Sequence, residues 1–425
     1  MYCRRKNCIN MAAVKWTIVL YGLLSLAGAE YYVFMNGDKA NQGNVEINNG
    51  TAWYNLCTDG WDDTDAAVMC RMLGYTGDGA NASVSDDGVT FSSQLQDKFD
   101  CDGTESSLQD CQTSSNNANA CENSTRSHMA CSDDPVPNDF FLVSLATAIA
   151  RMDRKTGSLS LVQSGTLERV IAITYDSVRN NIIWTDINLN QIALCGINGG
   201  DITVLHQAGN ASVMDGIAID EGSRQVFYTD TGYDEIGMIN LDTLVKTIVI
   251  NTDLDEPRAI ALDTTTREIF WTDWGANPRI EKSNYDGSGR TIIVSTGLGW
   301  PNAIVLNGDV LIWCDAQTDV FESVHTNGTG RVELISFNNH CFDFAIYEEY
   351  IYVNDWVYSK MVRVQTNGSV AELFGPSLSR RYGIFHYIKG NISYIYEFLS
   401  VKSVIVILYL LPNFKIYIFI YWALK

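Results

Sequence analysis

The sequence predicts a mainly β protein, in which a six-bladed β-propeller is preceded by a small disulfide-rich α+β domain. Two observations carry this prediction. An aromatic strand that ends in aspartate recurs after residue 140 at nearly constant spacing, and six cysteines lie close together before it. A fixed period of about 40 residues indicates a repeat architecture with one supersecondary unit per period.

The recurring strand occurs five times, and its closing aspartates lie 44, 43, 42 and 40 residues apart. The copies are Ile183-Trp184-Thr185-Asp186, Phe227-Tyr228-Thr229-Asp230, Phe270-Trp271-Thr272-Asp273, Ile312-Trp313-Cys314-Asp315 and Tyr352-Val353-Asn354-Asp355. One aspartate per period at the same strand end favours a structural role, tying neighbouring blades by hydrogen bonds, over a metal or catalytic role. We expect the tryptophans to form the core between blades.

Each period contains three further strands. An apolar alternating run such as Gly216-Ile217-Ala218-Ile219 comes before the aromatic strand, and a third strand ends at a turn such as Asp286-Gly287. A short β-branched strand, residues 291–294, closes the unit. Short strands separated by polar turns, with no helical period between them, predict four antiparallel strands per unit. Such units packed radially are the blades of a propeller.

The number of blades depends on the two ends of the repeat region. Residues 140–143, 149–152 and 159–162 provide second, third and fourth strands, but this blade lacks a first strand. Residues 382–387 form a first strand with no blade after it. We expect the two to pair and to close a ring of six blades.

The repeated Trp/Tyr-Thr-Asp line resembles the YWTD repeats of the LDL receptor family, over about residues 138–388. Its last two copies are eroded, since Cys314 replaces the threonine of one and Val353-Asn354 replaces Trp-Thr in the other. The resemblance implies a six-bladed propeller that binds or releases protein ligands through one mouth of the ring. The candidate ligand-binding residues at that mouth are Trp274, Trp300 and Trp356, with the acidic neighbours Asp215, Glu256 and Asp343.

Residues 1–29 are predicted to be a secretory signal peptide, with Met11 as the true start. Lys15 supplies the positive end, residues 18–26 the apolar core, and Ala27-Gly28-Ala29 the cleavage site. An uncleaved signal anchor is the alternative, which so short an apolar core disfavours. Export favours disulfides among the six clustered cysteines, although sequence alone leaves 15 connectivities open. Zinc binding is disfavoured because the segment has no Cys-x-x-Cys and only one histidine, His128.

The cysteine-rich segment resembles the scavenger receptor cysteine-rich (SRCR) domain, over about residues 33–132. The resemblance lies in Gly43-Asn44-Val45-Glu46, in the run from Trp61 to Tyr75 and in Asp100-Cys101-Asp102-Gly103. It implies the bridges Cys57–Cys121, Cys70–Cys131 and Cys101–Cys111. Residues 65–74 are predicted to be a short helix with Ala66, Met69 and Leu73 on its apolar side and Gly74 as its stop.

Some SRCR domains bind calcium or magnesium, and the resemblance places the matching positions at Thr58, Asp59 and Glu105. One aspartate of the usual pair is missing, so Asp59 and Glu105 form a weak metal site unless Asp62 or Asp63 contributes. A solvated acidic face is the favoured interpretation. No cofactor is firmly indicated, and Ca²⁺ at the SRCR domain is the alternative.

The formal net charge is −21, and both the cysteine-rich and the repeat regions are acidic. This argues against nucleic acid and favours basic protein partners or divalent cations. Seven Asn-x-Ser/Thr sequons suit an exported glycoprotein. They lie at Asn49, Asn81, Asn123, Asn210, Asn327, Asn367 and Asn391. Of Cys195, Cys314 and Cys341, at most one pair can bridge, and Cys314 is predicted to be a buried free thiol.

The domain boundaries predicted are a signal peptide at 1–29, an SRCR domain at 30–133, a linker at 134–138, the propeller at 139–388 and a hydrophobic tail at 389–425. Residues 401–424 are long enough to span a bilayer, but Pro412, Asn413 and Lys415 interrupt them. We favour a truncated or misassembled end over a membrane anchor, although membrane association through the tail is the alternative.

The sequence therefore predicts an extracellular or cell-surface receptor-type protein of the secretory pathway, which binds protein ligands through its SRCR and propeller surfaces. By fold-level analogy, binding leads to endocytosis or to Wnt-type co-receptor signalling. A soluble secreted pattern-recognition protein is the first alternative. A propeller lactonase is the remote one, because no catalytic motif is present and the predicted first strands offer mainly Ala, Ile, Val and Leu.

Overall fold

The structure is a computed structural model. It describes residues 31–86, 94–95, 97–115, 125–132, 137–336, 340–355, 358, 360–368, 371–378 and 381–388. The predicted signal peptide, the tail, most of the linker, and Cys121, Asn123, Trp356 and Asn391 lie outside these residues. In the part of the chain that is described, no helix is long and apolar enough to cross a membrane.

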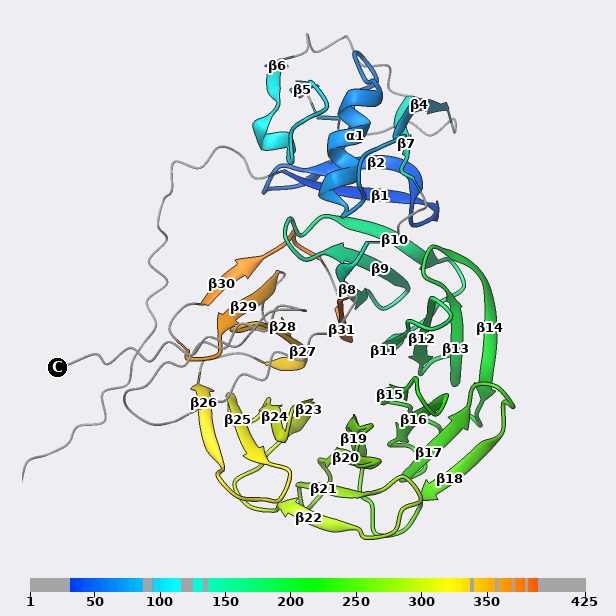
Figure 1. Cartoon of the computed structure of the whole chain (residues 1–425), viewed down its shortest axis with the longest axis vertical. Coiled ribbons are helices and arrows are strands. Elements are labelled where there is room, and N and C mark those ends of the chain that lie inside the picture. The colour runs from blue at the N-terminus through cyan, green and yellow to red at the C-terminus, as the bar shows by residue number, and fades with distance from the viewer. Residues whose placement is uncertain are drawn as a thin grey trace, which may run out of the picture. The chain divides into compact units, whose positions relative to one another are not determined.

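Six blades form a ring within the described residues: five are separate four-stranded sheets, and the sixth consists of four strands of a nine-stranded sheet. The strands β31, β11, β15, β19, β23 and β27 face the centre of the ring (Figure 1). Blade 1 is β31 (Ile384–Ile388), β8 (Asp139–Ser144), β9 (Ala148–Asp153) and β10 (Leu159–Ser164); blade 2 is β11 (Val170–Asp176), β12 (Asn181–Asp186), β13 (Gln191–Gly196) and β14 (Gly199–Gln207); blade 3 is β15 (Gly216–Asp220), β16 (Gln225–Asp230), β17 (Glu235–Asn240) and β18 (Lys246–Ile250). Blade 4 is β19 (Pro257–Asp263), β20 (Glu268–Asp273), β21 (Arg279–Asn284) and β22 (Thr291–Val294); blade 5 is β23 (Pro301–Asn307), β24 (Val310–Asp315), β25 (Val320–His325) and β26 (Val332–Ser336); blade 6 is β27 (Cys341–Tyr347), β28 (Tyr350–Asp355), β29 (Met361–Gln365) and β30 (Ala371–Phe374).

The ring closes where β31 pairs antiparallel with β8, with Ile384 opposite Val143 and Tyr387 opposite Phe140. The predicted closure is therefore present. Ser144 fixes the register, since its amide donates to the Gly383 carbonyl at 3.0 Å and its hydroxyl accepts from the Gly383 amide at 2.7 Å. Only glycine fits at 383, because a Cβ there would lie 2.5 Å from the Ile171 carbonyl oxygen.

The aromatic residue of each of the first four repeated strands is completely buried between its own blade and the preceding one. Trp271 of blade 4 packs with Phe227, Ile236 and Ile250 of blade 3. Trp313 packs in the same way against Phe270 and Ile280 of blade 4. Burying a side chain of this size removes 150–250 Å² of surface from water, so these contacts dominate the association of the blades.

The repeated aspartates anchor the linker that enters their own blade. Asp186 accepts from the amides of Glu168 and Arg169 at 2.8 and 3.0 Å, and Asp315 accepts from those of Gly299 and Trp300. Side-chain ties to the preceding blade come from arginines instead. Arg331 of blade 5 pairs with Glu322 and donates to the Thr296 and Gly297 carbonyls that follow blade 4.

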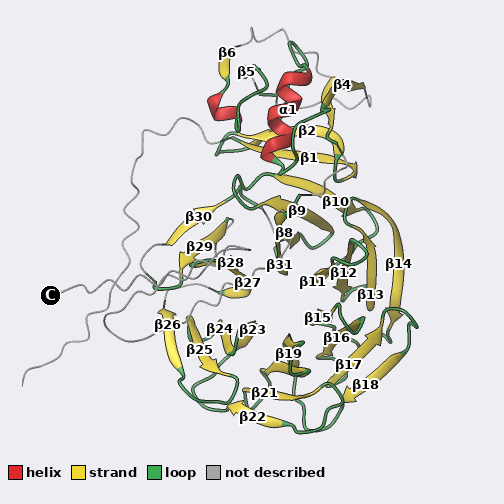
Figure 2. Ribbon diagram, viewed as in Figure 1, coloured by secondary structure: helices red, strands yellow, loops and turns green. Residues whose placement is uncertain are grey.

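The N-terminal cysteine-rich module, residues 31–132, holds the helices of the described chain (Figure 2). Its elements are β1 (Tyr32–Lys39), β2 (Gln42–Asn48), β3 (Trp53–Asn55), α1 (Asp63–Met72), β4 (Asn81–Asp86), β5 (Asp97–Asp100), the 3₁₀ turn Leu108–Asp110, β6 (Gln112–Ser115) and β7 (Thr125–Ala130). Helix α1 starts two residues before the predicted start because Asp62 caps it and forms a capping box with Asp65. It ends at Met72 with Leu73 as its C-cap, and the following residue, Gly74, has the positive φ of 88° that favours glycine.

The disulfides Cys70–Cys131 and Cys101–Cys111 are those that the SRCR resemblance implies. Cys57 is also disulfide-bonded, and Cys121, its predicted partner, lies outside the described residues. The prediction for Cys314 is wrong, because Cys314 is bonded to Cys341 and Cys195 is the buried free thiol. The reason is that Cys314 occupies the threonine position of its repeat. From that position in blade 3, Thr229 donates to a carbonyl in the first strand of the next blade, and Cys341 begins the corresponding strand.

Replacing Cys314 and Cys341 together by alanine should lower the free energy of unfolding by about 3 kcal/mol, because the bridge closes a loop between two blades. Denaturant unfolding followed by tryptophan fluorescence measures the change. Cys195→Ala is the matched control, since it removes an equally buried sulfur that forms no disulfide. Equal unfolding midpoints for the two variants would show that the bridge contributes nothing.

A half-buried group of charged side chains holds the closing strand in place. Asp139 of β8 accepts from Arg154 Nε at 2.7 Å and lies 3.0 Å from Nε2 of His386 in β31. Burial raises the pKa of Asp139, but the hydrogen bonds from His386 and Arg154 outweigh it and leave the pKa below its usual value. The ionised carboxylate therefore stabilises the closed ring.

Asp139→Asn should lower the free energy of unfolding by about 2 kcal/mol at pH 7. Since the folded-state pKa is depressed, this stabilisation is present above the unfolded-state pKa near 4 and is lost as the pH falls through the folded value. Urea unfolding of both proteins between pH 7 and pH 3 should show the difference shrinking below about pH 4. Asp309→Asn is the control, because Asp309 also faces a histidine, His325, but is 78% exposed. A gap that stays constant with pH would contradict the assignment.

Candidate protein-binding mouth of the propeller

One mouth of the propeller is built from the starts of first strands and the ends of second strands. These chain segments meet because the two strands are antiparallel neighbours, as where Pro257 at the start of β19 faces Asp273 at the end of β20. Asp215 precedes β15, Trp274 follows β20, and Asp343 lies at the start of β27. Blades 3, 4 and 6 thus contribute side chains to the same mouth.

Arg258 joins these side chains. Its guanidinium lies 4.3 Å from the ring centre of Trp274 and 4.9 Å from that of Phe342, and its Nη1 is 3.3 Å from Asp215 Oδ2. Only 6% of Arg258 is exposed. Burial lowers the pKa of Arg258, although the charges of Asp215, Asp343 and Glu256 oppose the shift. The two aromatic faces compensate for lost hydration, since cation–π contacts strengthen when desolvated.

Asp343 connects this cluster to the closing strand. Its carboxylate accepts from the Phe344 amide and from the Ile384 amide of β31, both at 2.9 Å. Desolvation raises the pKa of Asp343 to about 7, against the two amide hydrogen bonds and the charge of Arg258, which lower it. Asp343 thus changes charge near neutral pH.

Further aromatic side chains extend the mouth. Tyr382 packs edge-on against Phe342 with ring centres 5.2 Å apart, and Trp300 packs edge-on against His340 at 5.9 Å. Trp300, which lies just before blade 5, is 41% exposed. Its backbone amide is nevertheless fixed by a hydrogen bond to Asp315. An exposed, anchored indole is the kind of side chain that carries binding energy at protein interfaces.

The structure gathers three of the six predicted ligand-binding residues, Asp215, Trp274 and Asp343, around Arg258. Trp300 and Glu256 are exposed on their own linkers, and Trp356 lies outside the described residues. Sequence reasoning missed Arg258 and Phe342. Each occupies the second position of its first strand, after Pro257 and Cys341, so register within the repeat was the signal that could have found them.

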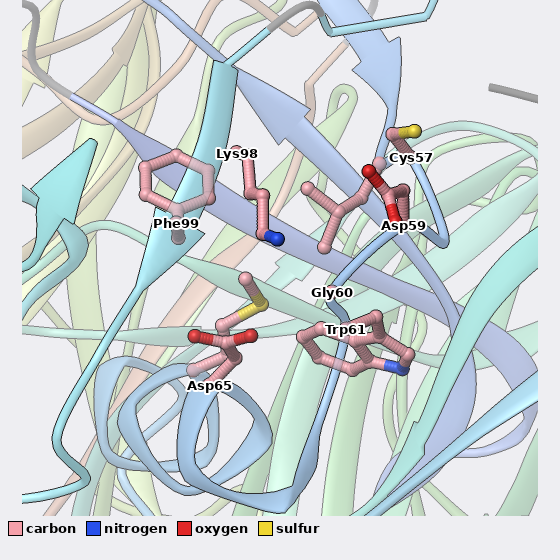
Figure 3. A pocket seen from close by; sticks show the side chains of 9 residues that line it. Cys57, Asp59, Gly60, Trp61, Asp65, Lys98 and Phe99 are labelled. Atoms are coloured by element: carbon pink, nitrogen blue, oxygen red, sulfur yellow. The ribbon is translucent and has the colours of Figure 1, made fainter. Parts of the chain in front are cut away.

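The predicted metal position Asp59 lines a small pocket in the cysteine-rich module (Figure 3). The Lys98 ammonium points into this pocket between Asp59 and Asp65, and it stands within 2.3 Å of where a Cβ on Gly60 would lie. Desolvation raises the pKa of Asp65 to about 6. The pocket therefore contains a positive charge of its own beside the carboxylates.

Glu105, the second predicted metal ligand, accepts from the amides of Asp102 and Gly103 at 2.9 and 3.0 Å. Among the described residues, the group of three or more metal-ligating side chains that lie close together is Cys101, Glu105 and Cys111, and its two cysteines are bonded to each other. In the part of the chain that the structure describes, no such group includes Asp59. The calcium site at Asp59 and Glu105 stays a prediction.

The described sequons lie at turns and strand starts. Asn81, Asn210, Asn327 and Asn367 are exposed and Asn49 is half-buried. Glycosylation of the seven predicted asparagines, including Asn123 and Asn391 outside the described residues, stays a prediction.

Comparisons with known proteins agree with both modules. A scavenger receptor cysteine-rich domain model matches residues 35–132, and a low-density lipoprotein receptor repeat class B model matches residues 267–306. The human low-density lipoprotein receptor-related protein 5-like protein is 32% identical over 191 residues, which are 44% of this chain and 75% of the relative. The chain belongs to the low-density lipoprotein receptor-related protein family.

Two further comparisons each match part of this chain. The vitellogenin receptor Yl of Drosophila melanogaster is 29% identical over 197 residues, 45% of this chain but 10% of that receptor. The chain thus spans a small part of that receptor. A chain from the crystal structure of a nidogen/laminin complex aligns with a TM-score of 0.55 and 27% identity. The alignment covers 59% of this chain and 98% of the chain from that complex.

Asp343→Asn should flatten the pH dependence of stability between about pH 4 and pH 7. The folded-state pKa is raised above the unfolded value near 4, so the folded protein binds the extra proton in this window and loses stability as the pH rises. In this window the free energy of unfolding of the wild type should fall more steeply with pH than that of the variant, by up to about 1.4 kcal/mol per pH unit. Urea titrations at closely spaced pH values measure it, with the exposed Asp201→Asn as the control. Identical slopes in wild type and Asp343→Asn would disprove the raised pKa.

Proposed function

We propose that this chain is the extracellular ligand-binding part of a receptor-type protein, and that the propeller mouth around Arg258 and Trp300 binds protein ligands. The observation that carries the proposal is the mouth itself, where exposed and buried aromatic rings, an arginine and carboxylates from several blades converge. Such a combination suits a protein interface, whose binding energy is concentrated in Trp, Tyr and Arg.

The family supports a protein as the ligand class. The Drosophila relative is named a vitellogenin receptor, vitellogenin being a protein, and the nidogen structure is a complex with laminin, another protein. The net charge of −21 favours basic partners, because complementary charge speeds association. Disulfides in both modules indicate an oxidising compartment, which agrees with the secretory pathway.

Cell-surface attachment and the outcome of binding belong to the same proposal. We place the protein at the cell surface or in the extracellular space, where ligand capture leads to endocytosis or to Wnt-type co-receptor signalling. A peptide that binds the chain, selected as described below, is labelled and added to cells that express the full chain. Uptake of this peptide distinguishes a surface receptor from a secreted binding protein.

Trp300→Ala should weaken binding of peptides selected against the propeller mouth by at least about tenfold, as expected for a central aromatic anchor. The peptides come from a displayed random library selected on the immobilised, secreted wild-type chain, and surface plasmon resonance gives their affinities. Ile292→Ala is the matched control, since Ile292 is 51% exposed on an outer strand. We also expect selected sequences to be enriched in Lys and Arg. Selected binders that tolerate Trp300→Ala but lose affinity with changes in the cysteine-rich module would move the binding surface away from the mouth.

A further inference from the structure

The outer strand of blade 1 differs from the outer strands of the other five blades in its hydrogen bonding. β10 pairs in parallel with β1 of the cysteine-rich module, with Phe34 opposite Leu159 and Met35 opposite Ser160. β14, β18, β22, β26 and β30 each end their sheets within the described residues. A free edge strand is a template for pairing with another chain, so β1 covers an edge that would otherwise be open.

Hydrogen bonds on both sides of this pairing hold the cysteine-rich module to the propeller. The Val33 amide donates to Ser158 Oγ at 3.1 Å, and the Thr156 hydroxyl donates to the Met72 carbonyl at the end of helix α1. The Ala40 amide donates to the Asn198 carbonyl between β13 and β14 at 3.0 Å. The Ala40 side chain is fully buried in a propeller core cluster. The contact therefore extends from blade 1 to blade 2.

A buried arginine lies at the centre of this contact. Arg151 of β9 is 1% exposed and has no carboxylate within 4.0 Å among the described residues. Its Nη2 donates to the hydroxyl of Tyr75, its guanidinium lies 4.8 Å from the centre of the Tyr75 ring, and its Nη1 donates to Asn198 Oδ1 at 3.3 Å. The Tyr75 hydroxyl in turn donates to the Ala40 carbonyl at 3.0 Å.

The Tyr75–Arg151 contact couples the two modules energetically. A charge removed from water is costly unless other groups compensate for the lost hydration. Tyr75 of the cysteine-rich module supplies both an acceptor and an aromatic face to Arg151. Docking of the module thus buries the charge and provides its partner in the same step.

We propose that the cysteine-rich module and the propeller form one rigid unit, in which β1 is a fifth strand of blade 1 and the Tyr75–Arg151 contact fixes the register. Ligand surfaces on the two modules then keep a constant geometry, unlike domains joined by a flexible linker. The inference does not depend on which ligand the mouth binds.

No described disulfide crosses between the two modules, so cutting the linker tests their association directly. The bonds Cys70–Cys131 and Cys101–Cys111 lie within the cysteine-rich module, and Cys314–Cys341 lies within the propeller. A specific protease site is inserted in the full chain between Asp133 and Asn138, the secreted protein is cleaved to completion, and the products are separated by gel filtration at low micromolar concentration. We expect the two halves to elute together.

Tyr75→Phe should raise the dissociation constant between the halves by about tenfold or more, because it leaves Arg151 Nη2 without its acceptor while keeping the ring. Ala40→Glu, which puts a carboxylate into the propeller core, should separate the halves on cleavage. Arg179→Ala is the control for an arginine change outside the contact, since Arg179 is 53% exposed and pairs with Asp242. Halves that separate in the cleaved wild type, or that stay together with unchanged affinity in Tyr75→Phe, would overturn the proposal. If Ala40→Glu is not secreted, the wild-type and Tyr75→Phe measurements decide the question by themselves.

Discussion

The packing of the aromatic second strands of blades 2 to 5 against the preceding blade is the interaction on which the rest of the structure depends. Tyr228, Trp271 and Trp313 are fully buried because each is covered by two blades. A single four-stranded sheet cannot bury both of its faces, so the blades are stable only as neighbours in a closed ring. The aspartate at the end of each aromatic strand then fixes the incoming linker, and these linkers form the mouth. Core packing and the candidate binding surface therefore share the same strand.

The repeat made most of the propeller predictable from sequence, because strand periodicity, turn residues and the buried aromatic position are local patterns that recur five times. The pairing of the closing strand could also be predicted from sequence, since one end of the repeat region lacks a first strand and the other end has a first strand with no blade after it. Cys314 was misjudged because its neighbour Cys341 belongs to the next blade, and only the cross-blade register brings the two sulfurs together. Arg258 was missed for the same reason, since its partners Asp215, Trp274 and Phe342 come from three blades. Register within the repeat marks the second position of each first strand, but it does not show that side chains from three blades converge there.

Two buried arginines of this acidic protein are accommodated in the same way, by packing against aromatic rings. Arg258 lies between Trp274 and Phe342 at the mouth, and Arg151 lies near Tyr75 and Phe140 at the contact between the modules. A guanidinium is planar and weakly hydrated, so it stacks on aromatic faces where an ammonium would lose more hydration. In each case the charge is buried against aromatic rings. The arginines thus act as fixed positive points that orient side chains from separate elements.

Blade 1 combines three distant parts of the sequence, and this gives it a special place in the ring. Its inner strand β31 comes from the C-terminal end of the repeats, and β1 of the cysteine-rich module covers its outer edge. Loss of β31 would open the inner edge at β8, and loss of β1 would open the outer edge at β10, so each addition protects an edge that the blade cannot protect by itself. Arg151 in the central strand β9 contacts Phe140 of β8 on one side and Tyr75 of the cysteine-rich module on the other. Closure of the ring and docking of the module therefore act on the same three-stranded core, and a change that loosens either one should weaken the other.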